Sequence, residues 1–422
     1  MTGVQTCALP IWRFWASYRA GKVDDAEIHQ VEGRLATTAG TCAVMGTAST
    51  MACITETLGM MLPGTAAIPA VHADRLRAAE ATGIAAARLA QTRITPDRII
   101  TKKSIENAIR VLMALGGSTN AVIHLTAIAG RAGIEIPLTW LNELSDTTPV
   151  LVNLKPTGSN YMEDFYAAGG MSGVLRELKP LLHLDAKTVT GRTLGEELDR
   201  AAAPFAQQVV RPLNQPIYPQ GGLAVLQGNL APGGAIIKAS AADPRLMEHM
   251  GRAVVFENLQ DLAERIDRDD LEVSADDILV LKNIGPKGAP GMPEAGYMPI
   301  PRKLARAGVK DMVRISDGRM SGTAFGTIVL HVTPESALGG PLAWVQTGDQ
   351  IRLSVSKREV QWLVSDEELA RRQAQNPITP PSAERGYRKL YLQSVLQADQ
   401  GADFDFLCPP GPRVKVPRQP GG

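Results

Sequence analysis

Apolar and polar positions in the first half of the chain recur at helical spacing. Residues 12–35 place large apolar side chains on one stripe, which predicts helix. A segment dominated by small residues follows at 37–64, and an apolar helix is expected to begin within it near Thr50. Helical patterns then return, with breaks at Gly116–Asn120 and Gly169-Gly170, in residues 73–92, 103–132, 138–146 and 161–178.

The pattern changes after about residue 186. A proline-rich stretch, RPLNQPIYPQGG, predicts an extended linker that we place at 196–219. Beyond it, short apolar runs between Gly/Pro turns predict strands. One helix is expected among them, at 257–267. The predicted strands are 223–226, 235–237, 253–256, 278–281, 327–330 and 351–355. The charged tail, 366–422, is expected to be helical to about 400 and frayed after Cys408.

These elements predict an α/β protein of two domains. The first, 12–195, is expected to be an α/β domain with an incomplete sheet, and the second, 220–365, a β-rich, barrel-like domain. Residues 1–11, MTGVQTCALPI, show no periodicity and join abruptly to the segment at Trp12. They resemble translated adapter sequence, so we interpret them as a non-native leader and leave them out of the fold prediction.

Charge and cysteine content narrow the classes of partner. Lysine and arginine number 44 against 43 acidic residues, a balance that supplies no basic field for nucleic acid or anionic membrane. The four cysteines are too widely spaced for a disulfide framework or a local metal knuckle, which favours a reducing, cytoplasmic setting. No segment has the apolar length of a bilayer span or the pattern of a signal peptide. We therefore expect a soluble protein with a small-molecule ligand.

The first candidate for chemistry is Cys42, in the small-residue run GTCAVMGTASTM that leads into a predicted helix. A lone cysteine in such a place is often a buried apolar residue. The alternative is a metal thiolate, because loop amides and a helix N-terminus stabilise negative sulfur and glycines admit a bulky cluster. Cys53, on the following helix among apolar residues, is interpreted as core packing.

Two further candidates lie in the second half. Glu294, in the run GPKGAPGMPEAG, is either a solvated loop residue or a hard oxygen ligand for Mg²⁺. Ser321, in ISDGRMSGTAFG, is either structural or a base in its alkoxide form, provided that a cation lowers its pKa. No histidine has the spacing of a serine-nucleophile triad, and no phosphate-binding glycine motif is present.

Seven segments in this order resemble the family of dihydroxy-acid, phosphogluconate and aldonate dehydratases. They are GTCAVMGTASTMACITETLGMMLPG, GGSTNAVIHL, NYMEDFYAAGGM, GPKGAPGMPEAG, ISDGRMSGTAFG, HVTPESALGGPLA and RGYRKLY. The resemblance implies that Cys42 is one of three cysteine ligands of an iron–sulfur cluster, 2Fe–2S in preference to 4Fe–4S. It also implies that Glu294 is a Mg²⁺ ligand and Ser321 the base, in a homodimer or homotetramer.

The reaction implied is loss of water from a 2,3-dihydroxy acid to give a 2-keto-3-deoxy acid. An open iron would act as Lewis acid for the C3 hydroxyl, while Mg²⁺ holds the carboxylate and C2 hydroxyl. The segment Arg319-Met320-Ser321-Gly322-Thr323 resembles the aldonate branch, so a sugar acid is favoured. Dihydroxy-acid dehydration in branched-chain amino-acid synthesis is the alternative.

One departure from the family pattern is serious. The motif Cys-Asp-Lys, which carries a second cluster cysteine and a metal-binding aspartate in family members, does not occur in this sequence, and the first cluster cysteine is also missing. We therefore expect an N-terminally truncated chain that is inactive alone. A noncatalytic remnant that serves as a binding or assembly subunit is the alternative from another class.

Overall fold

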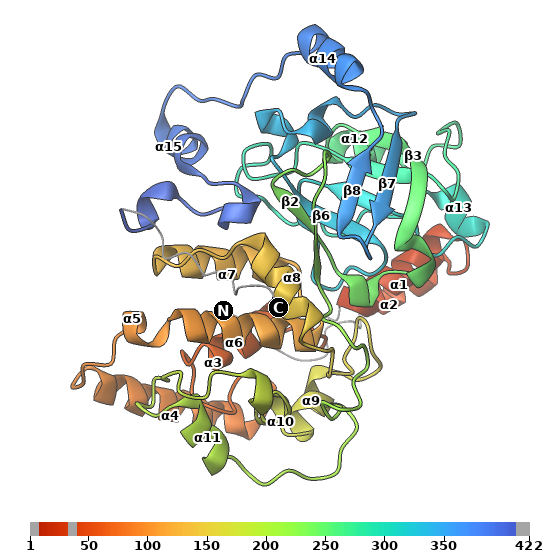
Figure 1. The fold of residues 1–422 in the computed structure, drawn as a ribbon. Coiled ribbons are helices and arrows are strands. Elements are labelled where there is room, and N and C mark those ends of the chain that lie inside the picture. The colour runs from red at the N-terminus through yellow and green to blue at the C-terminus, as the bar shows by residue number, and fades with distance from the viewer. Residues whose placement is uncertain (1–7, 33–39, 411–422) are drawn as a thin grey trace.

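A helical part and a β-rich part make up the computed structural model, which describes residues 8–32 and 40–410 (Figure 1). All eight strands lie between Ala224 and Trp362, and helices account for the regular structure that precedes them. The predicted α/β class is confirmed. The limits proposed for the two domains, the linker and the tail stay predictions.

The strands form one sheet with the order β1-β2-β6-β5-β4-β3-β7-β8. An isolated bridge between Gln227 and Glu359 joins the two edge strands, so the sheet is nearly closed into a barrel. β3, β4, β5 and β6 pair in parallel, and the other pairs are antiparallel. The strands are β1 (Ala224–Leu226), β2 (Gly234–Ile237), β3 (Glu248–Phe256), β4 (Ile278–Leu281), β5 (Arg314–Ser316), β6 (Ile328–Thr333), β7 (Gln350–Ser354) and β8 (Glu359–Trp362).

Apolar side chains fill the barrel. The inward residues of neighbouring strands, among them Ile237, Val255, Val280 and Val329, form one buried cluster. Each of these strands is too short to bury an apolar face alone, so closure of the sheet supplies the burial that stabilises it. Six of the eight strands match predicted runs; β5 and β8 are the additions.

Helices of the first half match the predicted patterns closely. The predicted break at residues 116–120 separates α6 from α7, and Gly169, with φ 95°, separates α9 from α10. The helices before the barrel are α1 (Ala8–Arg19), α2 (Asp25–Glu32), α3 (Thr47–Thr57), α4 (Ala73–Leu89), α5 (Pro96–Ile99), α6 (Lys102–Leu115), α7 (Asn120–Arg131), α8 (Leu138–Asp146), α9 (Met162–Ala167), α10 (Gly170–Glu177) and α11 (Leu194–Arg200).

The structure differs from the sequence-based expectation in two places near the N-terminus. The incomplete sheet expected within 12–195 is represented, among the described residues, only by isolated bridges, namely Leu154 with Asn160 and Lys187 with Thr193. Residues 8–11, assigned to an irregular leader, are helical because α1 begins at Ala8. The rest of that leader, residues 1–7, lies outside the described residues.

The helix α1 packs beside α2 and against α13 (Arg302–Arg306) of the barrel part (Figure 1). Arg19 donates to both carboxylate oxygens of Asp267, over 2.5 and 2.6 Å, and to the carbonyl oxygen of Ile300. The first helix therefore crosses to the second part of the molecule, although the sequence places it with the first.

A second apolar cluster joins the two parts of the molecule. Residues of α3, α6, α7 and α8 pack there with Val225 of β1, Ile236 of β2 and Leu223, which directly precedes β1. Asn142 of α8 both donates to the carbonyl oxygen of Val225 and accepts from its N–H. The interface is thus a continuous core, which fixes the orientation of the helices against the barrel.

The C-terminal helices run back over the barrel and toward α7 (Figure 1). They are α14 (Asp366–Gln375) and α15 (Gly386–Ser394); α12 (Leu259–Arg265) and α13 (Arg302–Arg306) lie between strands. The expected fraying of 411–422 falls outside the described residues. Among the helices that the structure describes, none combines the length and apolar character needed to cross a bilayer.

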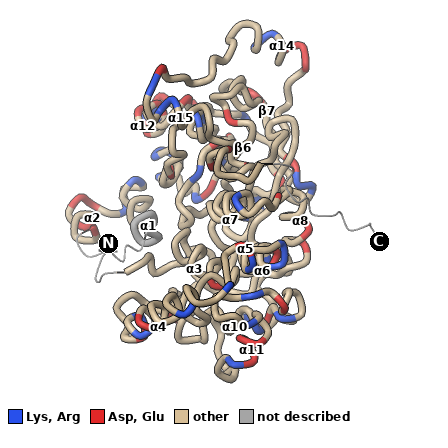
Figure 2. The backbone as a smooth tube through the Cα atoms, turned by 90° about the vertical axis from the view of Figure 1, so that its left-hand side faces the viewer, with Lys and Arg blue, Asp and Glu red and all other residues tan. Residues whose placement is uncertain are grey.

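Charges of both signs are interspersed along the backbone in both parts of the molecule (Figure 2). This distribution agrees with the near-neutral net charge and offers no extended basic surface.

Candidate functional site

The loop Gly40–Gly46 holds Cys42 in front of helix α3. The loop is pinned by backbone hydrogen bonds from Met45 to the carbonyl oxygen of Lys155 (2.9 Å) and from Met162 to that of Ala43 (2.8 Å). The hydroxyl of Ser49, in the first turn of α3, donates to the carbonyl oxygen of Val44 over 3.1 Å. These contacts keep Cys42 half-buried in the loop that leads into α3.

Cys42 lines a cavity of about 440 Å³. Arg75, Met162 and Glu163 also line it, together with small residues of α3 and of segment 66–70. Neither Glu294 nor Ser321 belongs to this lining, so the cavity beside Cys42 is not shared with the other two predicted site residues.

The other described cysteines do not extend a thiolate site. Cys53 is fully buried in the helical core, as its apolar neighbours indicated, and burial raises the pKa of its thiol strongly. Cys408 lies near Arg131, far along the chain in the C-terminal segment. Over residues 8–32 and 40–410, no three His, Cys, Asp or Glu side chains gather in a way that could hold a metal ion.

Glu294 and Ser321 are held side by side by two loops that pair through their backbones. Ala295 donates to the carbonyl oxygen of Arg319, and Ser321 donates to that of Gly296, both over 2.9 Å. Glu294 and Arg319 form a parallel bridge in the same stretch. The two residues, although 27 positions apart in sequence (321 − 294), thus lie on adjacent segments.

Helices α3 and α7 close over this pair from the first part of the molecule. The side-chain amide of Asn120, at the start of α7, donates to a carboxylate oxygen of Glu294 (2.5 Å) and to the carbonyl oxygen of Met320 (3.1 Å). Thr47, the first residue of α3, hydrogen-bonds to Ser118 over 2.9 Å and accepts from Asn120 over 3.1 Å. Polar residues from both parts of the molecule therefore converge on Glu294.

The approach of the two parts is close at Gly322. A Cβ at this position would lie 2.7 Å from the hydroxyl oxygen of Ser118 and 2.8 Å from the backbone nitrogen of Thr47. Only glycine fits next to these atoms, which gives the glycine of the Ser321-Gly322-Thr323 segment a packing role. The helix N-terminus at Thr47 is thereby brought against the residue next to Ser321.

Ser321 is partly accessible, and its hydroxyl lies 2.8 Å from that of Thr323. The backbone N–H of Thr323 also donates to the Ser321 hydroxyl oxygen, over 3.3 Å. This N–H is a donor that would stabilise negative charge on the Ser321 oxygen.

The electrostatics of Glu294 reflect opposing effects. Partial burial of the carboxyl group raises its pKa, whereas Arg319 and the hydroxyl of Thr47 lower it. Arg319 also lies near His124 and His331, and burial together with this positive charge lowers the pKa of both histidines. Both imidazoles are therefore neutral at pH 7.

We assigned no role to Asn120 or His331 from the sequence, although the structure places both in this neighbourhood. Asn120 is fully buried, and its side-chain oxygen has no hydrogen-bond partner in the described part of the chain. His331 is 4% exposed, has φ 58°, and neither ring nitrogen has a partner among the described residues. The break at Gly116–Asn120 was the available signal for Asn120, whereas a lone histidine in an apolar strand gave none.

A larger cavity, of about 610 Å³, lies between α1 and the barrel part. It is lined mainly by apolar groups, among them Tyr297, Ile300 and Phe325, and includes none of the predicted site residues. Its size alone therefore does not make it the site, because no polar groups converge in it in the manner of a catalytic pocket.

Comparison with known families gives two matches that together span most of the chain. Residues 1–197 match the family model described as dihydroxy-acid/6-phosphogluconate dehydratase N-terminal, and residues 208–402 match the corresponding C-terminal model.

Three relatives illustrate the range of similar proteins. The chain is 46% identical over 398 residues to 6-deoxy-6-sulfo-D-gluconate dehydratase of Pseudomonas putida, a match that covers 94% of this chain and 69% of that protein. It is 47% identical over 399 residues to L-arabinonate dehydratase of Rhizobium leguminosarum bv. trifolii, with the same coverage. It is 41% identical over 403 residues to dihydroxy-acid dehydratase of Caldanaerobacter subterraneus, covering 94% of this chain and 72% of that protein. These comparisons do not establish the expected N-terminal truncation.

Proposed function

Because the chain belongs to the dihydroxy-acid/6-phosphogluconate dehydratase family, we propose that it removes water from a 2,3-dihydroxy sugar acid and releases a 2-keto-3-deoxy acid. The family is one of hydro-lyases, as the names of its dehydratase members state. The observation that carries the proposal is the pairing of the Glu294 and Ser321 segments under Asn120.

Two findings support a sugar acid as the substrate class. Relatives named for sugar-acid substrates are 46% and 47% identical to the chain, against 41% for the dihydroxy-acid dehydratase quoted above. The segment Arg319–Thr323 also has the Met320 and Thr323 that resemble the aldonate branch. Dihydroxy-acid dehydration is the second candidate, since its substrate carries the same 2,3-dihydroxy carboxylate.

Ser321 is the proposed base. Its oxygen would take the proton from C2, the bond between C3 and its hydroxyl would break, and the hydroxyl would leave as water after it gains a proton. The enol that results gains a proton at C3, loses the proton of its C2 hydroxyl and becomes the 2-keto-3-deoxy acid. The N–H of Thr323 and the nearby N-terminus of α3 would stabilise negative charge on Ser321.

The iron–sulfur cluster and Mg²⁺ remain what the family resemblance implies, but the described residues do not fit either group. The cavity beside Cys42 presents one thiol, and Cys53 is sealed in the core. Glu294 is one carboxylate among neutral donors, with a cation, Arg319, nearby. A cluster needs several thiolates and Mg²⁺ holds its waters firmly, so we derive no step through them.

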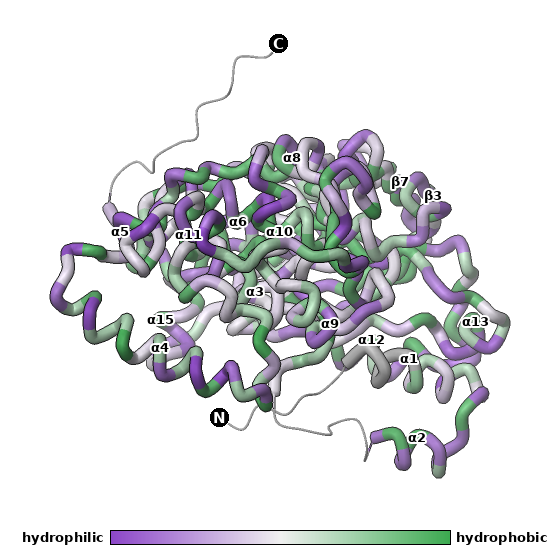
Figure 3. The backbone as a smooth tube through the Cα atoms, turned by 90° about the horizontal axis from the view of Figure 1, so that it is seen from below, coloured by the Kyte–Doolittle hydropathy of each residue, from purple (hydrophilic) through white to green (hydrophobic). Residues whose placement is uncertain are grey.

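We also propose that the protein works as a homodimer or homotetramer in the cytoplasm. Helix α4, 17 residues long, has no buried residue, and it lies along the edge of the molecule in Figure 3. A helix without a buried face is normally covered by another chain or domain. Cys42, Cys53 and Cys408, the described cysteines, form no disulfide with one another, which agrees with a reducing compartment. Light scattering that shows a monomer would contradict the assembly.

The central experiment measures 2-keto acid release from a panel of aldonates and from a branched 2,3-dihydroxy acid. We expect turnover with an aldonate by the protein expressed anaerobically. Ser321→Ala should lose at least about a hundredfold in kcat, the usual contribution of a positioned base. Ser356→Ala, at an exposed turn, is the matched control and should keep full activity.

Three outcomes would count against the proposal. Full turnover by Ser321→Ala would show that Ser321 is not the base. Preference for the branched acid would favour the second candidate. No activity on either substrate class would favour the noncatalytic alternative.

A further inference from the structure

Two carboxylates are buried behind the loops that carry Glu294 and Ser321. Asp317 is 0% exposed and Glu335 is 1% exposed. Neither forms an ion pair with a described lysine, arginine or histidine, although burial of an unpaired carboxylate is costly. Such a cost is tolerated only where backbone donors replace the lost water.

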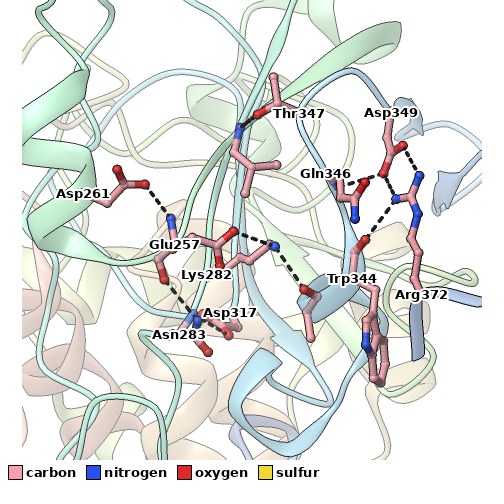
Figure 4. A network of polar contacts seen from close by, with 12 residues as sticks. Glu257, Asp261, Lys282, Asn283, Asp317, Trp344, Gln346, Thr347, Asp349 and Arg372 are labelled. Carbon is pink, nitrogen blue, oxygen red and sulfur yellow. Dashed lines mark hydrogen bonds and ion pairs between the residues drawn. The ribbon is translucent and has the colours of Figure 1, made fainter. Parts of the chain in front are cut away.

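Asp317 accepts hydrogen bonds from the backbone of two separate segments. The N–H groups of Asn283 (3.2 Å) and Ile284 (3.0 Å) donate to it from the end of β4, and that of Ser336 donates over 2.8 Å from the end of β6. Figure 4 shows Asn283 and Asp317 next to each other in the polar network at this end of the barrel. Burial raises the pKa of Asp317 to about 6, against the effect of these donors.

Glu335 holds the next turn of the same loop. It accepts from the N–H groups of Lys287 (2.9 Å) and Gly288 (2.8 Å) and from the side-chain amide of Gln397 (2.6 Å). A Cβ on Gly285 would lie 2.7 Å from a Glu335 carboxylate oxygen, so the loop wraps tightly around the carboxylate.

The loop continues from these contacts to Glu294 through short turns. Ala289 donates to the carbonyl oxygen of Gly285 (2.9 Å), and Met292 donates to that of Ala289 (2.8 Å). Arg319, two residues after Asp317, donates from Nε to the carbonyl oxygen of Met292 and accepts from Ala295. The residues 283–297 are therefore fixed at their base by Asp317 and Glu335 and at their far end by the Ser321 segment.

We propose that Asp317 and Glu335, the carboxylate clamp, are positioning residues that set the place of Glu294 beside Ser321. The proposal rests on the proposed function in one respect, which is that Glu294 and Ser321 take part in the dehydration. The clamp acts through the backbone of residues 283–297 and does not touch the substrate. Asp317 shares its segment with Ser321, so a shift of the clamp moves both site residues relative to each other.

The test compares Asp317→Asn and Glu335→Gln with the control Asp277→Asn. Asp277 is also buried and accepts a backbone N–H, from Ser274 over 2.8 Å, but it lies at the opposite end of β4. Asp317→Asn turns one acceptor oxygen into a donor that faces the N–H groups of Asn283 or Ser336. Glu335→Gln does the same toward Lys287 and Gly288, and it keeps the proposal testable if Asp317→Asn does not fold.

Hydrogen exchange followed by mass spectrometry on the whole chain is the decisive readout. In both clamp variants, we expect amides of 283–297 to exchange about tenfold faster or more, as expected for the loss of hydrogen-bond protection. The increase should extend past the clamped turns to 291–297, where Glu294 lies. Asp277→Asn should leave 283–297 unchanged. If exchange in 291–297 matches that of the parent protein in either folded clamp variant, the clamp does not position Glu294 and the proposal is wrong.

Kinetics give a second readout in an active preparation. A positioning role predicts that Asp317→Asn lowers kcat about tenfold or more with KM changed less than about threefold, because ground-state binding persists while alignment is lost. Equal kcat in Asp317→Asn and Asp277→Asn would overturn the role. If the parent protein dehydrates no sugar acid, the proposed function fails, and hydrogen exchange still decides whether the clamp holds the loop.

Discussion

The side-chain amide of Asn120 donates to the carboxylate of Glu294, which links the first turn of α7 to a loop of the barrel part. The same amide reaches the carbonyl oxygen of Met320, next to Ser321. One neutral side chain, fully buried, therefore connects the helical part to both site segments.

Asn120→Ala should destabilise the protein markedly. The change removes donors to Glu294, Thr47 and Met320, and it leaves the buried carbonyl oxygen of Met320 without this donor. We expect the free energy of unfolding to fall by about 2 to 3 kcal/mol, the cost of such unsatisfied groups. Urea unfolding followed by fluorescence measures it. Asn376→Ala, at an exposed position, is the control. If Asn120→Ala lowered the free energy of unfolding no more than the control does, the hydrogen bonds of Asn120 would contribute little to stability.

Glu56→Gln should change the pH dependence of stability. Glu56 is buried, accepts from the N–H groups of Gly64 and Ala66, and burial raises its pKa to about 7 from 4.5. The folded state therefore binds the proton more tightly than the unfolded state. The stabilisation from this group is full below about pH 4.5 and is lost as pH rises through 7.

Urea unfolding of Glu56→Gln and the parent protein across pH 4.5 to 8 measures this effect. The variant should gain stability relative to the parent by up to about 3 kcal/mol over that range, from 1.36 kcal/mol for each pKa unit. Glu384→Gln, at an exposed position, should show no such trend. A constant difference between Glu56→Gln and the parent would contradict the raised pKa.

His331→Asn should reduce the loss of stability that the parent protein suffers at acidic pH. Burial, with Arg319 and His124 nearby, lowers the pKa of His331 to about 3 from 6.5. The unfolded chain binds a proton at this histidine at a higher pH than the folded state does. The stabilisation from neutral His331 is therefore full above about pH 6.5 and is lost as pH falls toward 3. Asparagine tolerates the φ of 58° at this position.

The variant should therefore lose less stability than the parent protein between pH 7 and pH 4. The difference is expected to be about 3 kcal/mol at pH 4, since 1.36 kcal/mol corresponds to one pKa unit and most of the shift lies above that pH. Thermal unfolding at a series of pH values measures it, with the exposed His29→Asn as control. Parallel pH profiles for His331→Asn and the parent would refute the prediction.

Arg372→Ala should release the C-terminal helix α14 from the barrel. Arg372 donates to both carboxylate oxygens of Asp349 (2.6 and 2.9 Å) and to the carbonyl oxygen of Trp344 (3.0 Å), as Figure 4 shows. Removing it leaves Asp349 buried without its cation, a change that costs about 3 kcal/mol or more. Limited proteolysis within 366–385 should become faster.

The neighbouring residue provides a matched control for that prediction. Arg371 pairs with Glu368 on the exposed side of α14, with 53% of its side chain accessible. Arg371→Ala should change the free energy of unfolding by about 0.5 kcal/mol or less, as surface ion pairs usually do. If Arg371→Ala and Arg372→Ala lowered the free energy of unfolding equally, burial of the Arg372–Asp349 pair would not account for its contribution to stability.

The sequence by itself determined the order and type of most elements. Periodicity located the helices because an apolar stripe of 8 to 17 residues repeats often enough to be recognised, as in α4, α6 and α8. It located the strands that are continuous apolar runs, such as β4. It missed β5, which has three residues and starts with Arg314, and β8, in which buried Val360 and Trp362 alternate with polar residues.

The tertiary structure decided which of the predicted site residues meet. Motif spacing singled out Cys42, Glu294 and Ser321, and the fold brought Glu294 beside Ser321 through backbone pairing and placed Cys42 at a separate cavity. Asn120 gains its meaning only from a partner 174 residues away, and Asp317 from segments 19 to 34 residues away. His331 is notable because neither ring nitrogen has a partner among the described residues. Local sequence determines periodicity and turns, because these depend on neighbours along the chain. Burial, pKa and hydrogen-bond partners depend on distant segments, and only the folded chain brings these together.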